Sequence, residues 1–168
     1  MRDALTHAHQ GGLVVFNIGM TIRRPLRVDL WGPVFLAMPR MLKELQLNRD
    51  AVDRGEPVED LGFLGAATML SGSGPWVTQY WRGVDQLYAY ARQPDARHVP
   101  AWRAFNAAAR RHPEAVGIWH ETFVVPEGGV ETLYANGALV GLAQATGAIP
   151  ATRRGRSARE RLSSELTP

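Results

Sequence analysis

The order of strand-like and helix-like segments constrains the fold of this chain more than any other sequence feature. Leu13–Ile22 is rich in branched apolar residues and stops before an Arg-Arg-Pro run, so it predicts a strand. Leu30–Leu47 carries apolar residues at helical spacing and predicts a helix that Pro39 kinks or divides in two. The polar stretch Asn48–Asp60 contains helix breakers, and we expect it to be an exposed connection.

The rest of the chain continues this alternation. The sequence predicts two strands joined by a glycine-rich turn, over Leu61–Leu70 and Trp76–Trp81. The first of these segments also fits a short helix or loop. Further segments predict, in chain order, a helix over Val84–Ala91, a helix over Pro100–Arg111, and strands over Val116–Val125 and Val130–Ala135. The order β-α-β-β-α-β with one extra strand is typical of the ferredoxin-like split βαβ arrangement, an α+β fold with an antiparallel sheet.

Length and composition fit one domain. A chain of 168 residues that is 45% hydrophobic can bury a single core. We expect a flexible N-terminus over residues 1–12, a folded domain over 13–148, and a basic, flexible tail over 149–168. No apolar run reaches the roughly 18 residues of a membrane span, and the first residues lack the apolar centre of a signal peptide. We therefore expect a cytoplasmic protein without membrane contact.

The basic excess argues against nucleic-acid binding. The chain has 19 basic and 16 acidic residues, and the surplus comes from arginines after Ala151. The remainder is balanced, so no segment forms a phosphate-binding face, and we expect no nucleic-acid partner. The absence of cysteine excludes disulfides, thiolate metal sites and a cysteine nucleophile.

Histidines are the main candidates for chemistry. His120 precedes a glutamate, but Val124 stands where a zinc protease needs its second histidine, so that class is excluded. His7 and His9 form a pair without a third ligand, a poor metal site. Strand alternation puts His120 on one face with Ile118, where it is either a hydrogen-bonded core residue or an acid/base group in a pocket.

Other candidates have two interpretations each. His98 precedes a predicted helix and either lies near its cap or points into a site. Asn17 is a lone amide in an apolar strand and needs hydrogen-bond partners if it is buried. Several aromatic residues either form plain core or line a pocket for a flat apolar substrate or haem: Trp76, Tyr80, Trp81, Trp102 and Trp119.

The segments YWRGVDQLYAYAR, HVPAW and GIWHET within Gly62–Gly137 resemble a monooxygenase-like family once called a domain of unknown function, DUF4188. Phe16–Gln46 is similar to the N-terminal half of the same family. The resemblance implies a dimeric α/β barrel, in which a ferredoxin-like protomer pairs its sheet with that of a second copy. Relatives in that superfamily include cofactor-free monooxygenases that tailor polyketides and more distant haem enzymes such as aldoxime dehydratases.

Three functional hypotheses follow. The first is a homodimeric monooxygenase acting with O₂ on a small hydrophobic metabolite of aromatic or polyketide type. It needs no cofactor, and His120 is its base. The resemblance adds His98 as a motif position, and Asn17 is the proposed donor to a developing enolate. The pocket walls would be Tyr80, Trp81, Trp102 and Trp119. The second places haem in the pocket with His98 or His120 as axial ligand, and the third is a non-catalytic binding dimer.

Overall fold

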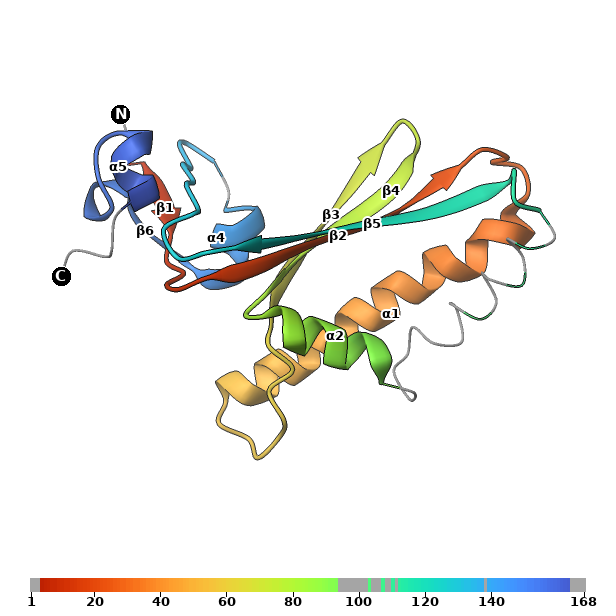
Figure 1. The fold of residues 1–168 in the computed structure, drawn as a ribbon, viewed down its shortest axis with the longest axis horizontal. Helices are drawn as coiled ribbons and strands as arrows, with labels where there is room; N and C mark the ends of the chain where they lie inside the picture. The colour runs from red at the N-terminus through yellow and green to blue at the C-terminus, as the bar shows by residue number, and fades with distance from the viewer. Residues whose placement is uncertain are drawn as a thin grey trace.

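The computed structural model describes residues 4–93, 103, 107, 110, 112–137 and 139–163. Its centre is a four-stranded antiparallel sheet in the order β3-β4-β2-β5 (Figure 1). The strands are β2 (Leu13–Ile22), β3 (Phe63–Ser71), β4 (Gly74–Trp81) and β5 (Val116–Val125). Two helices, α1 (Val28–Asp53) and α2 (Val84–Arg92), lie on one face of this sheet.

This topology confirms the predicted fold. The chain runs β2-α1-β3-β4-α2-β5, and β4 lies between β3 and β2, which is the split βαβ order. The pairs β2–β4, β2–β5 and β3–β4 are all antiparallel. Strands β3 and β5 form open edges, so the described residues of one chain make an open sheet and no closed barrel.

Helix α1 is longer than the sequence predicts. It continues through Pro39 as one helix and ends at Asp53, so it is not divided in two at Pro39. The exposed connection predicted over Asn48–Asp60 is wrong as far as Asp53 and is confirmed from Arg54 onward. The Asn48 side chain donates to the Glu59 carbonyl at 2.8 Å and accepts from the Leu61 amide at 3.2 Å. These bonds hold the following loop against the last helical turns. The polar segment that starts at Asn48, which has the composition of a loop, is thereby kept helical as far as Asp53.

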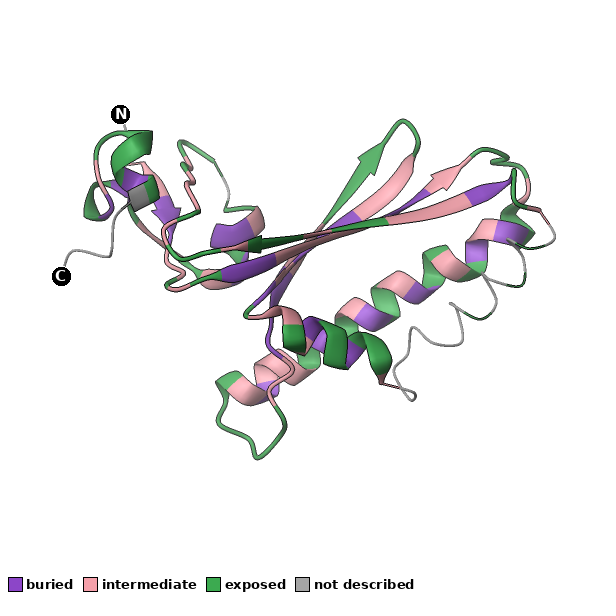
Figure 2. Cartoon of the chain, viewed as in Figure 1, coloured by how far each residue is buried: buried purple, intermediate pink, exposed green. Residues whose placement is uncertain are grey.

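The core lies between the sheet and the two helices near one end of the sheet. Its buried members come from both helices and three strands (Figure 2): Val14, Met41, Leu45, Phe63, Trp81, Leu87 and Tyr90. The indole of Trp81 meets the Phe63 ring edge-on at 5.4 Å and the Tyr90 ring at 5.8 Å. This apolar contact anchors α2 to the sheet.

Both expected flexible ends contain secondary structure. Strand β1 (Leu5–His7) pairs with β6 (Ala148–Pro150), and the short helices α4 (Gly141–Thr146), η1 (Ala151–Arg153) and α5 (Ala158–Ser163) surround them. We call β1, β6, η1, α5 and residues 130–135 the terminal lobe. The strand predicted over Val130–Ala135 is wrong, since only Tyr134 pairs, as an isolated bridge to Leu5.

Polar side chains hold the terminal lobe together. Arg161 is 6% exposed and pairs with Glu131 through two nitrogens at 2.6 and 2.8 Å. The buried Arg154 donates to the His9 carbonyl, and Thr6 bonds to Thr132 at 3.0 Å. Arginines that the sequence places in a solvated tail are therefore partly interior, because distant residues supply their partners.

Helix α4 packs against β3 and β4, on part of the sheet face opposite α1 and α2. Glycine at position 65 permits this approach, since a Cβ there would lie 2.7 Å from the Cβ of Ala145. None of the helices in the described ranges is both long and apolar enough to cross a membrane. The helix predicted over Pro100–Arg111 falls mostly outside the described residues.

Candidate functional site

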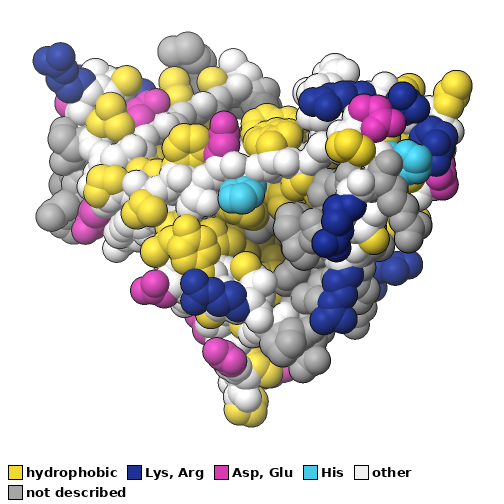
Figure 3. All heavy atoms as spheres, turned by 45° about the vertical axis from the view of Figure 1, so that its right-hand side comes forward, with side chains coloured by type: hydrophobic (Ala, Val, Ile, Leu, Met, Phe, Trp, Pro, Cys, Tyr) yellow, Lys and Arg dark blue, Asp and Glu magenta, His cyan; other side chains and the backbone are white. Residues whose placement is uncertain are grey.

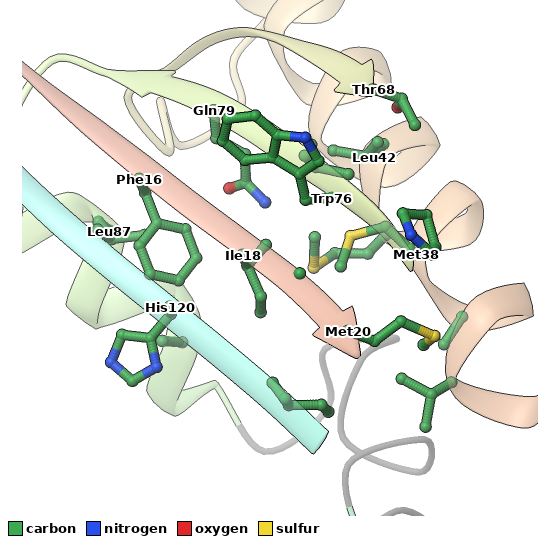
Figure 4. Close-up of a pocket in the computed structure, with 18 of the residues that line it drawn as sticks. Phe16, Ile18, Met20, Met38, Leu42, Thr68, Trp76, Gln79, Leu87 and His120 are labelled. Atoms are coloured by element: carbon green, nitrogen blue, oxygen red, sulfur yellow. The ribbon is translucent and has the colours of Figure 1, made fainter. Parts of the chain in front are cut away.

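A cavity of about 430 Å³ opens between the sheet and the helices α1 and α2. Its size is within the range of small-molecule sites. Figure 3 shows hydrophobic side chains gathered in a hollow with a histidine at its edge. The lining comes mainly from β2, β4, β5, α1 and α2, and its apolar part includes Phe16, Ile18, Met20, Met38, Leu42, Val77, Trp81, Leu87 and Ile118 (Figure 4).

The lining is suited to apolar ligands of variable shape. Most of its side chains are aliphatic or aromatic, and Met20, Met38 and Met41 contribute flexible thioether chains. No lysine, arginine, aspartate or glutamate is among the described lining residues. The described wall therefore offers nothing to pair with a strongly charged ligand, and it favours a neutral hydrophobic one.

His120 lies at the cavity, as the strand alternation predicts. It shares the lining with Ile118 and Thr122 of β5, and its side chain is exposed. The imidazole is 5.8 Å from the Phe16 ring, between centroids, with the rings tilted by 41° (Figure 4). An accessible imidazole beside an apolar space can exchange protons with both a bound ligand and solvent.

Asn17 does not meet His120. It belongs to the alternate positions of β2, which face away from α1 and α2, whereas its neighbours Phe16 and Ile18 line the cavity. Its Oδ1 accepts a hydrogen bond of 2.8 Å from the Thr78 hydroxyl. The structure thus places this amide in a cross-strand pair on the opposite face, away from the role expected from the sequence.

The predicted aromatic wall is divided between the two faces. Trp81 lines the cavity, while Tyr80 and Trp119 occupy the alternate positions on the opposite face. Burial raises the pKa of Tyr80, which lies beneath α4. The centroids of the Trp119 and Trp76 rings are 5.7 Å apart, and Trp76 also contributes to the cavity lining. His98 and Trp102 lie outside the described residues.

Gln79 is a polar lining residue that the sequence analysis missed. It is 1% exposed, and its Oε1 accepts a 3.0 Å hydrogen bond from the Trp81 indole. Its Nε2 has no hydrogen-bond partner among the described residues. The missed signal was period-two spacing, because Val77, Gln79 and Trp81 alternate on one strand and so face the same side.

The described residues show no metal centre. No group of three or more His, Asp or Glu side chains is placed to hold an ion within the described ranges. His7 is buried in the terminal lobe, and burial together with the Arg154 charge lowers its pKa to about 4. A histidine in that setting is a structural group, separate from the cavity.

Two known proteins are similar to this chain. Monooxygenase af470 of Aspergillus fumigatus is 28% identical to this chain over 139 residues. The match covers 78% of this chain and 46% of that protein, so the chain spans about half the length of this relative. The structure of SnoaB, a cofactor-independent oxygenase from Streptomyces nogalater, aligns with a TM-score of 0.42 and 14% identity. That alignment covers 69% of this chain and 95% of SnoaB.

The model of the Monooxygenase af470-like family matches residues 13–142, a range that includes the whole four-stranded sheet and both helices of the cavity. The match confirms the resemblance to a monooxygenase-like family carried by the segments around Trp81 and His120. The chain therefore belongs to the Monooxygenase af470-like family.

Proposed function

We propose that this protein is a monooxygenase that oxidises a small hydrophobic metabolite, of aromatic or polyketide type, inside the cavity between the sheet and α1 and α2. The apolar lining, with His120 as its one accessible histidine among the described residues, is the observation that carries the proposal. Membership of a monooxygenase family supports the reaction class. The substrate type rests on the neutral, partly aromatic walls.

The proposed chemistry needs only a base, an apolar space and O₂. An imidazole nitrogen of His120 takes a proton from an acidic methylene of the substrate, which leaves a carbanion conjugated to a carbonyl. The carbanion passes an electron to O₂, and the two radicals combine as a peroxide. Loss of water then leaves a new carbonyl, so the methylene carbon supplies all the electrons that O₂ takes up. One oxygen atom enters the product and the other leaves as water.

A haem enzyme in the same cavity has weaker support. His120 offers an imidazole as an axial ligand, and His98 lies outside the described residues. Haem also carries two propionates, and no arginine or lysine lines the described part of the cavity to pair with them. These residues do not fit haem well. We expect the purified protein to show no Soret band.

A homodimer belongs to the same proposal. The sheet face opposite α1 and α2 carries the exposed side chains Met69 and Phe123, and β5 leaves an open edge. Burying this face against a second copy would complete a barrel. Light scattering should therefore give twice the chain mass of 18.5 kDa at micromolar concentration. A mass of one chain under those conditions contradicts the dimer.

The direct test of the function uses anthrone, a flat tricyclic ketone with an acidic methylene. Under ¹⁸O₂ the protein should convert it to the quinone with one labelled oxygen, without added cofactor. The variant His120→Gln keeps a polar side chain but removes the titratable ring, and turnover should fall by roughly 10²–10⁴-fold. Oxygen uptake and mass spectrometry measure both effects.

Two controls make this test decisive. His7→Gln changes a histidine outside the cavity and should leave turnover unchanged. Because His120 is exposed, His120→Gln should also retain the circular dichroism spectrum and the melting temperature. Undiminished turnover in His120→Gln would remove the histidine from the mechanism, and a Soret band in wild-type protein would favour the haem alternative.

A further inference from the structure

We infer that Gln79 is the specificity-determining contact of the cavity, and that its side-chain amide donates a hydrogen bond to a carbonyl or enolate oxygen on an otherwise apolar ligand. The inference rests on the proposed function for taking this cavity as the substrate site. It adds the chemical feature by which a ligand is recognised there. Gln79 takes the donor role that the sequence assigned to Asn17.

The orientation of the Gln79 amide is fixed by its neighbour. An indole N–H can only donate, so the Gln79 atom that lies 3.0 Å from Trp81 Nε1 has to be the carbonyl oxygen. The opposite orientation would place two donors against each other. The NH₂ group is therefore held on the other side of the amide plane, where it is available to a ligand.

The NH₂ group has no partner in the part of the chain that the structure describes. Gln79 is 1% exposed, and Nε2 has no hydrogen-bond partner among the described residues. Figure 4 shows the Gln79 side chain among the lining residues, with its nitrogen toward the interior of the pocket. A buried hydrogen-bond donor without an acceptor is energetically unfavourable. A ligand that supplies an acceptor therefore forms a hydrogen bond and also removes this unfavourable free energy.

The surroundings restrict the acceptor to a neutral or weakly basic oxygen on an apolar frame. The described lining carries no charged side chain, and the Met38 and Met41 chains can rearrange to admit a ligand as far as Gln79. A carbonyl oxygen conjugated to an acidic methylene fits this setting. As the methylene loses its proton, charge develops on that oxygen, and a fixed amide donor becomes more favourable.

A matched pair of probes tests the inference. 1-Tetralone and tetralin have the same fused carbon frame and differ in one carbonyl group. Binding is measured without O₂ by quenching of tryptophan fluorescence, and the readout is the ratio of the two affinities. From wild type to Gln79→Met this ratio should shift against tetralone by roughly tenfold, the usual worth of one hydrogen bond in a buried site.

A control variant lies on the same strand as Gln79 but outside the cavity. Thr78→Val also removes a polar group at nearly constant size, and it should leave the affinity ratio unchanged within about twofold because Thr78 faces the other side of the sheet. The wild-type protein supplies a further measurement that does not depend on a folded variant. The side-chain amide protons of Gln79 should shift downfield in the NMR spectrum with 1-tetralone and not with tetralin.

The outcomes separate this inference from the proposed function. An affinity ratio that is equal in wild type and Gln79→Met overturns the inference even if anthrone is oxidised, as does failure of 1-tetralone to bind. If Gln79→Met does not fold, unshifted amide protons in the wild type overturn it instead. A ratio that changes as expected, in a protein that oxidises nothing, supports Gln79 as the binding contact and contradicts the monooxygenase.

Discussion

The sheet with α1 and α2 and the terminal lobe are stabilised in different ways. The first region is built on apolar contacts among residues such as Leu45 and Trp81, which are fully buried. The terminal lobe instead buries His7, Arg154 and Arg161, and specific polar partners bind the two arginines. Apolar packing is non-directional and leaves room for a cavity, whereas buried polar groups require one defined arrangement.

This difference accounts for where the site lies. A cavity lined by methionine and leucine can accept ligands of different shape at small cost, because its side chains have several usable rotamers. The terminal lobe has less freedom, since moving Glu131 or Arg161 would break their largely buried ion pair. The two regions should therefore respond differently to truncation of apolar groups, loss of charge and acid.

The largest effect should come from the apolar core. Leu45 is 0% exposed, and Leu45→Ala removes three carbon atoms from the contact between α1 and the sheet. We expect a loss of about 2–5 kcal/mol in the free energy of unfolding, measured by chemical denaturation. A loss below about 1 kcal/mol would show that this region tolerates voids and would remove the contrast with the terminal lobe.

A smaller loss should follow from breaking the buried ion pair. Glu131→Gln removes the carboxylate that pairs with the Arg161 guanidinium, while the carbonyls of Gly155 and Arg156 still accept from it. We expect the free energy of unfolding to fall by about 1–3 kcal/mol. This loss is smaller than that for a fully buried pair because Glu131 is partly exposed. The matched control is Asp29→Asn in the exposed pair with Arg27, which should cost less than about 1 kcal/mol. Equal losses in both variants would mean that burial does not matter here.

The smallest effect should be a dependence on pH that originates in the terminal lobe. Burial, and then the charge of Arg154, lowers the pKa of His7 from 6.5 to about 4. Between these values the unfolded chain binds a proton that the folded chain does not, so stability is full above about pH 6.5 and is lost toward pH 4.

Because of the lowered His7 pKa, the free energy of unfolding should fall by roughly 1–2 kcal/mol from pH 7 to pH 5. Denaturation at several pH values measures it. His7→Gln should flatten this part of the profile, while His120→Gln, in the other region, should keep it. A wild-type profile that is level over the same range would contradict the assignment to His7.

The sequence predicts the sheet well because its signals are local. Leu13–Ile22 and Val116–Val125 are strands with the predicted bounds, since branched residues and period-two alternation act within one segment. The same alternation correctly places His120 with Ile118 on one face. The alternation does not predict which face of the sheet the helices cover, because this depends on where α1 and α2 pack.

The errors share one physical cause, which is contact between distant residues. Asn48 stays helical because the loop carrying Glu59 and Leu61 folds back onto it. Arg161 is buried because Glu131 meets it. Gln79 escapes notice because its environment is created by helices from elsewhere in the chain. The local sequence around a residue does not show which distant residues will contact it in the folded chain.

The pairing of β1 with β6 has a consequence for how the chain folds. Leu5–His7 meets Ala148–Pro150, so these strands cannot pair until nearly all of the intervening chain is in place. Closing so long a loop is entropically costly and slow compared with forming the helices and the β3–β4 hairpin. During synthesis the sheet and its cavity can therefore assemble first, and β1 remains without its partner until the C-terminal segment emerges from the ribosome.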